Sequence, residues 1–281
     1  MTSAKPKKLL ADEILRLHKI MHDLRDPKTG CPWDVEQDFE SIAPYTIEEA
    51  YEVADAIAGG NRQKLAEELG DLLLQVVFHS QMAAEEGSFT MADVAAGISD
   101  KMIRRHPHVF ADDVRPDAAG QTKRWEDIKA AERAAEAEAK TGSETGTADL
   151  SVLDGISINL PAMVRAEKLQ KRAARVGFDW PDMQAVFAKM DEEIAELQDA
   201  MADARKTQSD IADEVGDILF VAANIARKAG VNPETALLAC NRKFETRFRY
   251  VEAALQSQNR RLEEATLEEM ESLWQEAKHK R

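Results

Sequence analysis

Apolar residues recur along this chain at intervals of three and four positions, the spacing that places them on one face of an α-helix. Two consecutive segments show this apolar seam most clearly: Val186, Met190, Ile194, Leu197 and Met201, followed by Ile211, Val215, Ile218 and Ala222. No stretch alternates strictly between apolar and polar residues, as a half-buried strand would. The pattern therefore predicts an all-α protein made of small helical bundles.

Polar residues and glycines mark where several of these helices begin or end. Pairs with the spacing of a capping box or of an N-cap predict three helix starts: Thr46–Glu49, Thr266–Glu269 and Asn232–Pro233. The run Gly59–Gly60–Asn61 predicts a tight break between two helices. These signals outline helical hairpins.

One short motif occurs twice, inside two apolar helices. EELGD at 67–71 and DEVGD at 213–217 each place a glycine in a helix interior, which costs about 1 kcal/mol relative to alanine. Other landmarks recur at nearly the same separation, for example Trp33 and Trp180. Such repetition indicates a duplicated domain.

A change of composition separates the two copies. Residues 130–150 pass from an Ala/Glu-rich helix end into Gly, Ser and Thr without apolar periodicity, which is typical of a linker. We therefore expect a first helical domain at 1–135, a linker at 136–150 and a second helical domain at 151–281.

Each copy carries four acidic residues in two pairs. Glu49, Glu52, Glu68 and Asp71 are named the first acidic set, and Glu193, Glu196, Glu214 and Asp217 the second acidic set. On each helix of the second copy, the members of a pair lie about 60° and about 120° from the apolar seam, on the same side. If the two helices of a copy form an antiparallel hairpin, both acidic pairs lie on the same flank, because their angles from the apolar seam are equal. They also lie at matching distances from the turn. The four carboxylates of each set are then expected to converge.

Converging carboxylates repel one another and take up protons or cations. Oxygen ligands suit hard cations, and Mg²⁺ is held by a few carboxylates while it keeps water and phosphate oxygens as its other ligands. A single acidic pair ordinarily decorates a solvated helix face, but a symmetric set in both copies favours a metal site. Glu49 could instead belong to the Thr46 capping box, yet at the matching place of the second copy Met190 cannot cap and Glu193 is kept.

The composition limits which binding partners and which cellular compartment are expected for the protein. Asp and Glu number 52 against 37 Lys and Arg, and the net charge of −15 disfavours binding to nucleic acid or to anionic membranes. A phosphate-bearing ligand would need a metal or a basic pocket. The two cysteines, Cys31 and Cys240, are too few for a disulfide framework, and neither a signal core nor a membrane-length apolar stretch is present. We therefore expect a cytoplasmic protein without nucleic-acid or membrane partners.

The chain combines several motifs: EEAYE with EELGD, DEEIAE with ADEVGD, GCPWD, RRHPHVF and RVGFDW. This combination resembles the MazG family of nucleoside triphosphate pyrophosphohydrolases, in its two-domain form and over nearly the whole chain. The resemblance implies an all-α bundle that forms a homodimer and uses Mg²⁺, which Mn²⁺ could replace. It also implies hydrolysis of NTP or dNTP at the α-phosphorus to the nucleoside monophosphate and pyrophosphate.

The resemblance also implies roles for individual residues. The second acidic set would hold Mg²⁺, with the first acidic set in the matching positions, and Glu192 or Glu193 would orient a metal-bound water. Nucleotide contacts would come from Lys189, Asp213, Lys243, Arg247 and Trp274 in the second domain, and from Lys101, Arg105 and Trp125 in the first. The cations could equally form an ordinary basic helix face, and Trp274 a core or dimer-interface aromatic. Because Tyr45 stands in the first domain where Lys189 stands in the second, we expect the principal activity in the second domain.

Two other interpretations stay open at this point. A di-iron or di-manganese carboxylate bundle would need Glu-x-x-His pairs on facing helices, and the sequence offers only Glu276–His279 near its C-terminus. A non-enzymatic acidic helical scaffold would use the carboxylates for solvation, so their replacement by amides would change nothing measurable. His106 and His108 flank Pro107, which is expected to hold them extended in a loop with structural roles.

Overall fold

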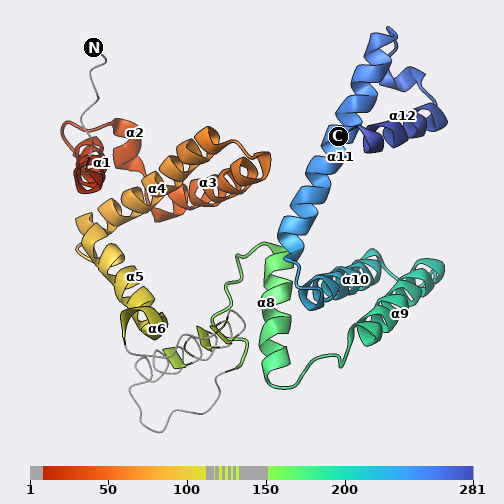
Figure 1. Cartoon of the computed structure of the whole chain (residues 1–281), viewed down its shortest axis with the longest axis horizontal. Helices are drawn as coiled ribbons and strands as arrows, with labels where there is room; N and C mark the ends of the chain where they lie inside the picture. Colours follow the sequence, from red (N-terminus) through yellow and green to blue (C-terminus); the bar gives the residue numbers. More distant parts are fainter. Residues whose placement is uncertain are drawn as a thin grey trace. The chain divides into compact units, whose positions relative to one another are not determined.

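The computed structural model describes residues 9–111, 117, 120–121, 124–125, 128, 131–132 and 151–280. The chain divides into two compact units, Met1–Ala134 and Ala135–Arg281. Every regular element in the described part of the chain is helical (Figure 1), which confirms the predicted all-α class. None of the described helices combines the length and the apolar content needed to cross a membrane. The predicted linker at 136–150 lies outside the described residues, and the exact domain boundaries stay a prediction.

The first unit is built around one helical hairpin. Its described helices are α1 (Leu10–Leu24), α2 (Pro32–Glu36), α3 (Phe39–Gly59), α4 (Arg62–Glu85), α5 (Met91–Arg105) and α6 (Pro107–Phe110). Helices α3 and α4 form the hairpin, and both α1 and α5 pack on α4 (Figure 1). Helix α4 is therefore the central element of this unit.

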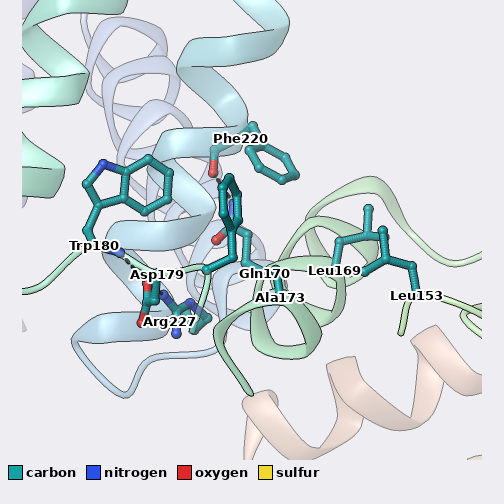
Figure 2. A pocket seen from close by; sticks show the side chains of 9 residues that line it. Leu153, Leu169, Gln170, Ala173, Asp179, Trp180, Phe220 and Arg227 are labelled. Carbon is teal, nitrogen blue, oxygen red and sulfur yellow. Dashed lines mark hydrogen bonds and ion pairs between the residues drawn. The ribbon is translucent and has the colours of Figure 1, made fainter. Parts of the chain in front are cut away.

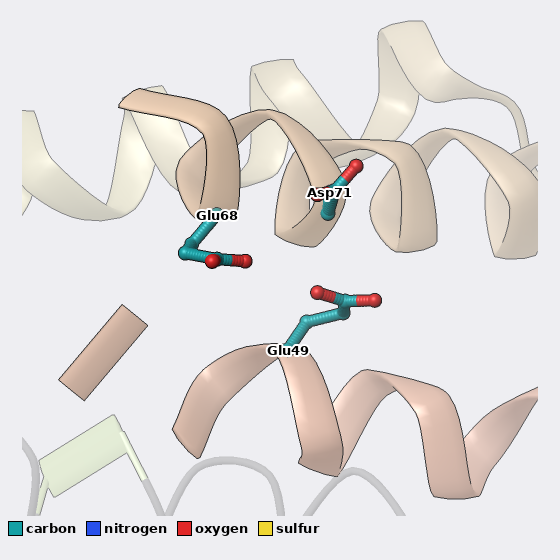
Figure 3. A group of neighbouring side chains, drawn as sticks. All are labelled: Glu49, Glu68 and Asp71. Carbon is teal, nitrogen blue, oxygen red and sulfur yellow. The ribbon is translucent and has the colours of Figure 1, made fainter. Parts of the chain in front are cut away.

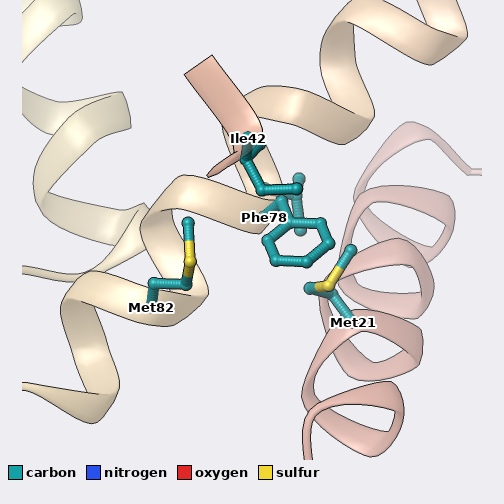
Figure 4. Packing of buried hydrophobic residues seen from close by; sticks show 5 residues of the cluster. Met21, Ile42, Phe78 and Met82 are labelled. Carbon is teal, nitrogen blue, oxygen red and sulfur yellow. The ribbon is translucent and has the colours of Figure 1, made fainter. Parts of the chain in front are cut away.

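A small apolar core joins α1, α3 and α4. Its buried members are Met21, Ile42, Val77, Phe78 and Met82 (Figure 4). The guanidinium of Arg25 lies 5.4 Å from the centre of the Phe78 ring, and it donates hydrogen bonds to Glu85 and to the carbonyl oxygens of Asp34 and Gln37. One buried cation thus ties the segment between α1 and α3 to the end of α4.

Helix α3 begins eight residues earlier than the sequence suggested, with its N-cap at Asp38 and not at Thr46. Asp38 accepts a hydrogen bond from the backbone N–H of Ser41, and the two residues form a capping box. The prediction that a helix starts at Thr46 is therefore wrong: Thr46 lies inside α3, and its hydroxyl is 3.0 Å from Nε2 of His79. Capping by Thr46 is thereby removed as an explanation of Glu49.

The turn between α3 and α4 lies where the sequence placed it. Gly60 has φ 69°, a left-handed conformation that glycine adopts without strain. The side chain of Asn61 then accepts hydrogen bonds from the backbone N–H groups of Gln63 and Lys64 and caps α4. The hairpin is therefore closed by local chemistry.

The second unit has a hairpin of the same kind. Its described elements are α8 (Ala162–Arg175), α9 (Met183–Ala202), α10 (Gln208–Lys228), α11 (Pro233–Ser257), η1 (Leu262–Glu264) and α12 (Leu267–His279). Helix α10 packs on α9 and on α8, and α12 packs on α11. Asn232 with Pro233 starts α11, and Thr266 with Glu269 starts α12. Both predicted helix starts are confirmed.

The segment around Pro107 is only partly extended. Residues Pro107–Phe110 form the single turn α6, so the expectation that His108 lies in an extended loop is wrong. His106 ends α5, where its Nδ1 lies 2.7 Å from the carbonyl oxygen of Met102, and its ring meets that of Trp125 nearly perpendicularly. His106 is thus engaged in packing.

His79 makes the stability of the first unit depend on pH. Burial lowers the pKa of His79, whereas in the unfolded chain it titrates near its ordinary value of about 6.5. Neutral His79 therefore contributes fully above about pH 6.5, and this contribution is lost as the pH falls through the folded-state pKa. We expect His79→Ile, which installs the residue type found at the matching position 225, to flatten the decline in unfolding free energy between pH 7.5 and 5.5. Urea denaturation at each pH measures this, and equal pH slopes in both proteins would contradict it.

Candidate active site

The second acidic set meets on the α9–α10 hairpin. Glu193 and Glu196 on α9 and Glu214 on α10 each offer a carboxylate oxygen, and these oxygens lie within 4.8 Å of one another. Asp217, the fourth member, is exposed and lies outside this group. Glu193 is only 4% exposed, so hairpin packing holds at least one carboxylate away from bulk water.

The first acidic set meets in the same manner. Figure 3 shows Glu49 reaching from α3 towards Glu68 and Asp71 on α4, with oxygens again within 4.8 Å of one another. Glu52 is exposed beside this group, where hydrogen bonding with Glu68 and repulsion from it raise the pKa of Glu52. The structure thus brings together three of the four residues named for each set.

Both groups have more negative charge than the surrounding protein satisfies. Burial, followed by the charges of Asp71 and Glu68, raises the pKa of Glu49; burial, followed by the charge of Glu193, raises the pKa of Glu196. The Oε2 atoms of Glu49 and Glu193 are buried without a hydrogen-bond partner in the described part of the chain. A buried anionic oxygen without a donor is costly, and a cation between the carboxylates would relieve the cost. The atoms available to bind a metal in these groups are all carboxylate oxygens, so the groups could hold a metal ion of the hard divalent type.

One lysine lies against each group, but the two lysines come from opposite helices of the hairpin. Lys189 on α9 places Nζ 2.8 Å from both Glu192 and Glu193, and its hydrogen bonds to these two carboxylates raise the pKa of Lys189. In the first unit, Lys64 on α4 lies 3.3 Å from Glu68. Sequence reasoning missed Lys64, although its spacing of four residues before Glu68 was a usable signal.

The two hairpins differ at their open ends, that is, at the ends away from the turn. Tyr45, at the position matching Lys189, is 42% exposed. Its ring packs against the ring of Trp33, with the centroids 6.3 Å apart and the planes nearly perpendicular. An aromatic pair therefore stands in the first unit where the second unit has a cation.

The two candidate catalytic carboxylates lie in different surroundings. Glu193 belongs to the buried group, whereas Glu192 is exposed and pairs with Lys189. Asp213 is also exposed, next to Glu214 on α10. Glu192 and Asp213 therefore lie at the solvent side of the site.

The remaining cations and the tryptophan of the second unit are on other helices. The Arg247 guanidinium lies 5.6 Å from the centre of the Trp274 ring, and the Phe244 ring packs against the same indole; Lys243 is exposed on α11. Figure 1 shows α12 beside α11, away from the α9–α10 hairpin. The structure does not bring Trp274 to the carboxylates of its own chain.

The matching residues of the first unit take part in packing. Arg105 donates to Glu132 at 2.5 Å, and the indole N–H of Trp125 donates to the backbone carbonyl of Arg105 at 3.1 Å. Lys101 is half-buried on α5. Arg105 and Trp125 are therefore held by contacts within their own unit.

The glycines of the repeated motif face open space. A Cβ atom added at Gly70 or at Gly216 would meet no atom within 4 Å. No neighbouring helix of the described chain explains these glycines, so the space beside them is free for a ligand or for a second copy of the chain.

Neither carboxylate group contains a histidine within the described residues. Glu276, the acid of the one Glu-x-x-His pair, accepts a hydrogen bond from the Tyr250 hydroxyl at 3.1 Å. The geometry therefore lacks the histidines that a di-iron bundle requires.

Comparison with known proteins agrees with this geometry. Residues 37–110 match the family model of the MazG nucleotide pyrophosphohydrolase domain, and residues 167–244 match that of phosphoribosyl-ATP pyrophosphohydrolase. The chain is 48% identical to a nucleoside triphosphate pyrophosphohydrolase of Escherichia coli (strain K12), over 95% of this chain and 97% of that protein. The chain belongs to the MazG family. It is therefore an enzyme of the class that hydrolyses acid anhydrides, and the resemblance seen in its motifs is confirmed.

A second relative supports the two-domain form of this MazG family member. The nucleoside triphosphate pyrophosphohydrolase/pyrophosphatase MazG of Thermotoga maritima is 41% identical over 93% of this chain and 94% of that protein. The two matched ranges contain both acidic sets, while Arg247 and Trp274 lie beyond them. The family models thus cover the hairpins more fully than the cations and aromatics around them.

Replacement of Gly216 separates helix stability from use of the open space. We expect Gly216→Leu to raise the free energy of unfolding by about 0.5–1 kcal/mol, because leucine is the better helix former and a Cβ atom at this position meets no atom within 4 Å, and to lower the rate of hydrolysis. Gly97→Leu is the matched control, since Gly97 lies within α5 and also faces open space. Denaturation and pyrophosphate release measure the two effects; full activity in Gly216→Leu would contradict the interpretation.

Proposed function

We propose that this protein hydrolyses ribo- and deoxyribonucleoside triphosphates to the monophosphate and pyrophosphate, with Mg²⁺ as cofactor and Mn²⁺ as a substitute. The observation that carries the proposal is the convergence of Glu193, Glu196 and Glu214 around a buried, unpartnered carboxylate oxygen, directly beside Lys189. The names of both relatives support the same substrate class.

In the second domain, acidic residues would bind the metal and a basic residue would bind the phosphate. The second acidic set would hold Mg²⁺, with Asp217 turning in from the surface. When bound, the metal would supply a water of lowered pKa and would polarise the phosphoryl group. Of the two glutamates, Glu193 is the better placed to orient that water, because it is buried within the carboxylate group. Glu192 pairs with Lys189 at the solvent side of the site. The Lys189 ammonium stands where it can pair with a phosphate oxygen.

We also propose that the active form is a homodimer. Trp274 and Arg247 lie on helices away from the carboxylates of their own chain, so a second copy could supply these residues together with Lys243. Large apolar side chains on the hairpin are exposed, among them Ile194 at 40% and Leu219 at 53%. A partner that covers them would bury apolar surface and complete the site.

The principal activity is proposed for the second domain. In the first domain Tyr45 replaces the cation, and Arg105 is held by Glu132, so fewer positive charges are free to meet a triphosphate. The first acidic set could still hold a metal. Lys101, and Lys64 beside Glu68, are the candidates left there for a phosphate contact.

A direct test compares single carboxylate-to-amide changes that keep side-chain size. Glu214→Gln should lower Mg²⁺-dependent pyrophosphate release by at least about 100-fold, because an amide is a poor ligand for a hard cation, and should leave the helical circular dichroism unchanged. Glu68→Gln should cost less, since it affects the first domain. Glu263→Gln, an exposed carboxylate outside both sets, is the control. Retained activity in Glu214→Gln would contradict the assignment of the metal to the second acidic set.

A further inference from the structure

The RVGFDW motif at 175–180 has no role in the proposed function, yet ion pairs fasten it to the end of α10. Asp179 accepts hydrogen bonds from Arg227 at 2.5 Å and from Lys228 at 3.2 Å. Lys228 also donates to the carbonyl oxygen of Trp180 at 2.6 Å. Figure 2 shows Asp179 and Trp180 beside Arg227. The contacts of Asp179 with Arg227 and Lys228 are named the Asp179 clamp.

Apolar packing beside the Asp179 clamp is incomplete. A pocket of about 240 Å³ lies between α8, the RVGFDW motif and α10, and its walls include Trp180, Phe220 and Arg227 (Figure 2). Atoms that border such an opening lack packing partners on that side. Arg227 is held from α10 itself, where it donates to the fully buried Asn224. The ion pairs are therefore a specific tie between the motif and α10.

The clamp lies at the open end of the α9–α10 hairpin. Arg227 and Lys228 are the last two residues of α10, and Asp179 lies in the segment that leads from α8 into α9. At the other end, the short turn after Ala202 joins the two helices covalently. The second acidic set lies between these two ties, since Glu193 is in the middle of α9, about 15 Å from its first residue. The hairpin is thus fastened on both sides of its carboxylates.

The first unit is fastened at the corresponding place with the charges reversed. There the segment between α1 and α3 contributes the cation, Arg25, and the last residue of α4 contributes the carboxylate, Glu85, at 2.8 Å. In the second unit the incoming segment contributes the carboxylate and the end of the helix contributes the cations. The two units therefore share the position of this tie and differ in its polarity.

Repulsion within the second acidic set explains what such a tie can do. Oxygens of Glu193, Glu196 and Glu214 lie within 4.8 Å of one another, and Lys189 offers them a single positive charge. Without a metal, this repulsion favours the separation of α9 from α10. A hairpin joined only at its turn could open at the far end, whereas a clamp there keeps the oxygens together. Ligands that are already in place lower the cost of binding a metal.

We propose that Asp179 is a positioning residue for the second acidic set. Through Arg227 and Lys228 it holds the start of α9 against the end of α10, so that the carboxylates are in place before the metal binds. The inference rests on the proposed function, which takes this set as the metal site. Asp179 touches neither metal nor nucleotide in this assignment, so it acts on metal affinity and not on the chemical step.

The test measures how pyrophosphate release depends on the Mg²⁺ concentration. Asp179→Asn keeps the size of the side chain and replaces one carboxylate oxygen by an amino group that faces a cation. The Mg²⁺ concentration for half-maximal activity should rise about tenfold, the low end of what residues supporting metal ligands contribute. At saturating Mg²⁺, kcat should stay within about twofold of wild type, because the chemical step is untouched. Asp179→Glu, which keeps the charge, should restore the Mg²⁺ dependence. An unchanged Mg²⁺ dependence in Asp179→Asn would overturn the assignment.

Two further variants separate positioning from a general loss of stability. Glu85→Gln is the matched control, because it weakens the corresponding ion pair of the first unit; it should lower the free energy of unfolding and leave the Mg²⁺ dependence unchanged. An equal shift in Glu85→Gln would overturn the clamp. Lys228→Met keeps the pair between Asp179 and Arg227, so it should fold even if Asp179→Asn does not. It should shift the Mg²⁺ dependence in the same direction by a smaller factor, and no shift would count against the clamp.

Metal binding to the full chain tests the clamp without catalysis. Mn²⁺ binding is followed by electron paramagnetic resonance in a Glu68→Gln background, which weakens the first acidic set so that the second dominates the titration. Asp179→Asn should raise the Kd for Mn²⁺ about tenfold, and an equal Kd with and without this change would overturn the clamp. Weaker Mn²⁺ binding in Asp179→Asn, together with no pyrophosphate release by the wild type, would refute the proposed function and leave the clamp in place.

Discussion

Repulsion between carboxylates on one flank of a helical hairpin is the constraint on which the rest of this structure depends. Packing of the apolar seams buries Glu193 in one hairpin and Glu68 in the other, so these groups cannot rely on water to screen their charge. One lysine lies against each group, and one ammonium cannot balance three carboxylates. A divalent cation would supply the missing positive charge and would let a polyphosphate approach a protein with a net charge of −15.

In the two copies, the lysine beside the carboxylates lies at opposite ends of the hairpin. Lys64 lies near the hairpin turn of the first unit, because it follows Asn61 by one helical turn, whereas Lys189 lies at the open end of the second hairpin. At the open end of the first, Tyr45 packs against Trp33. Duplication has therefore kept the carboxylate geometry and changed the chemistry beside it, which is why equal acidic sets do not imply equal activities.

Helix α10 links the second acidic set to the rest of its unit. One side of it packs on α9 and contributes Glu214 to the carboxylate group, and another packs on α8, where the carbonyl of Phe220 accepts a hydrogen bond from Gln170. Gly216 lies between Glu214 and Asp217 on this helix, with open space beside it.

The sequence by itself determined the elements that follow from helical rotation and local capping. The seams, the turn at Gly60 and the flank occupied by each acidic pair could be read in this way, because 3.6 residues per turn fixes the direction of every side chain along a helix. Local signals failed where two of them competed: Thr46 resembled a cap, but the earlier pair Asp38 and Ser41 starts the helix. Tertiary structure alone decided the contacts between distant residues, such as Arg105 with Glu132 and Gln170 with Phe220. No periodicity encodes such pairs, since they depend on how one helix lies against another.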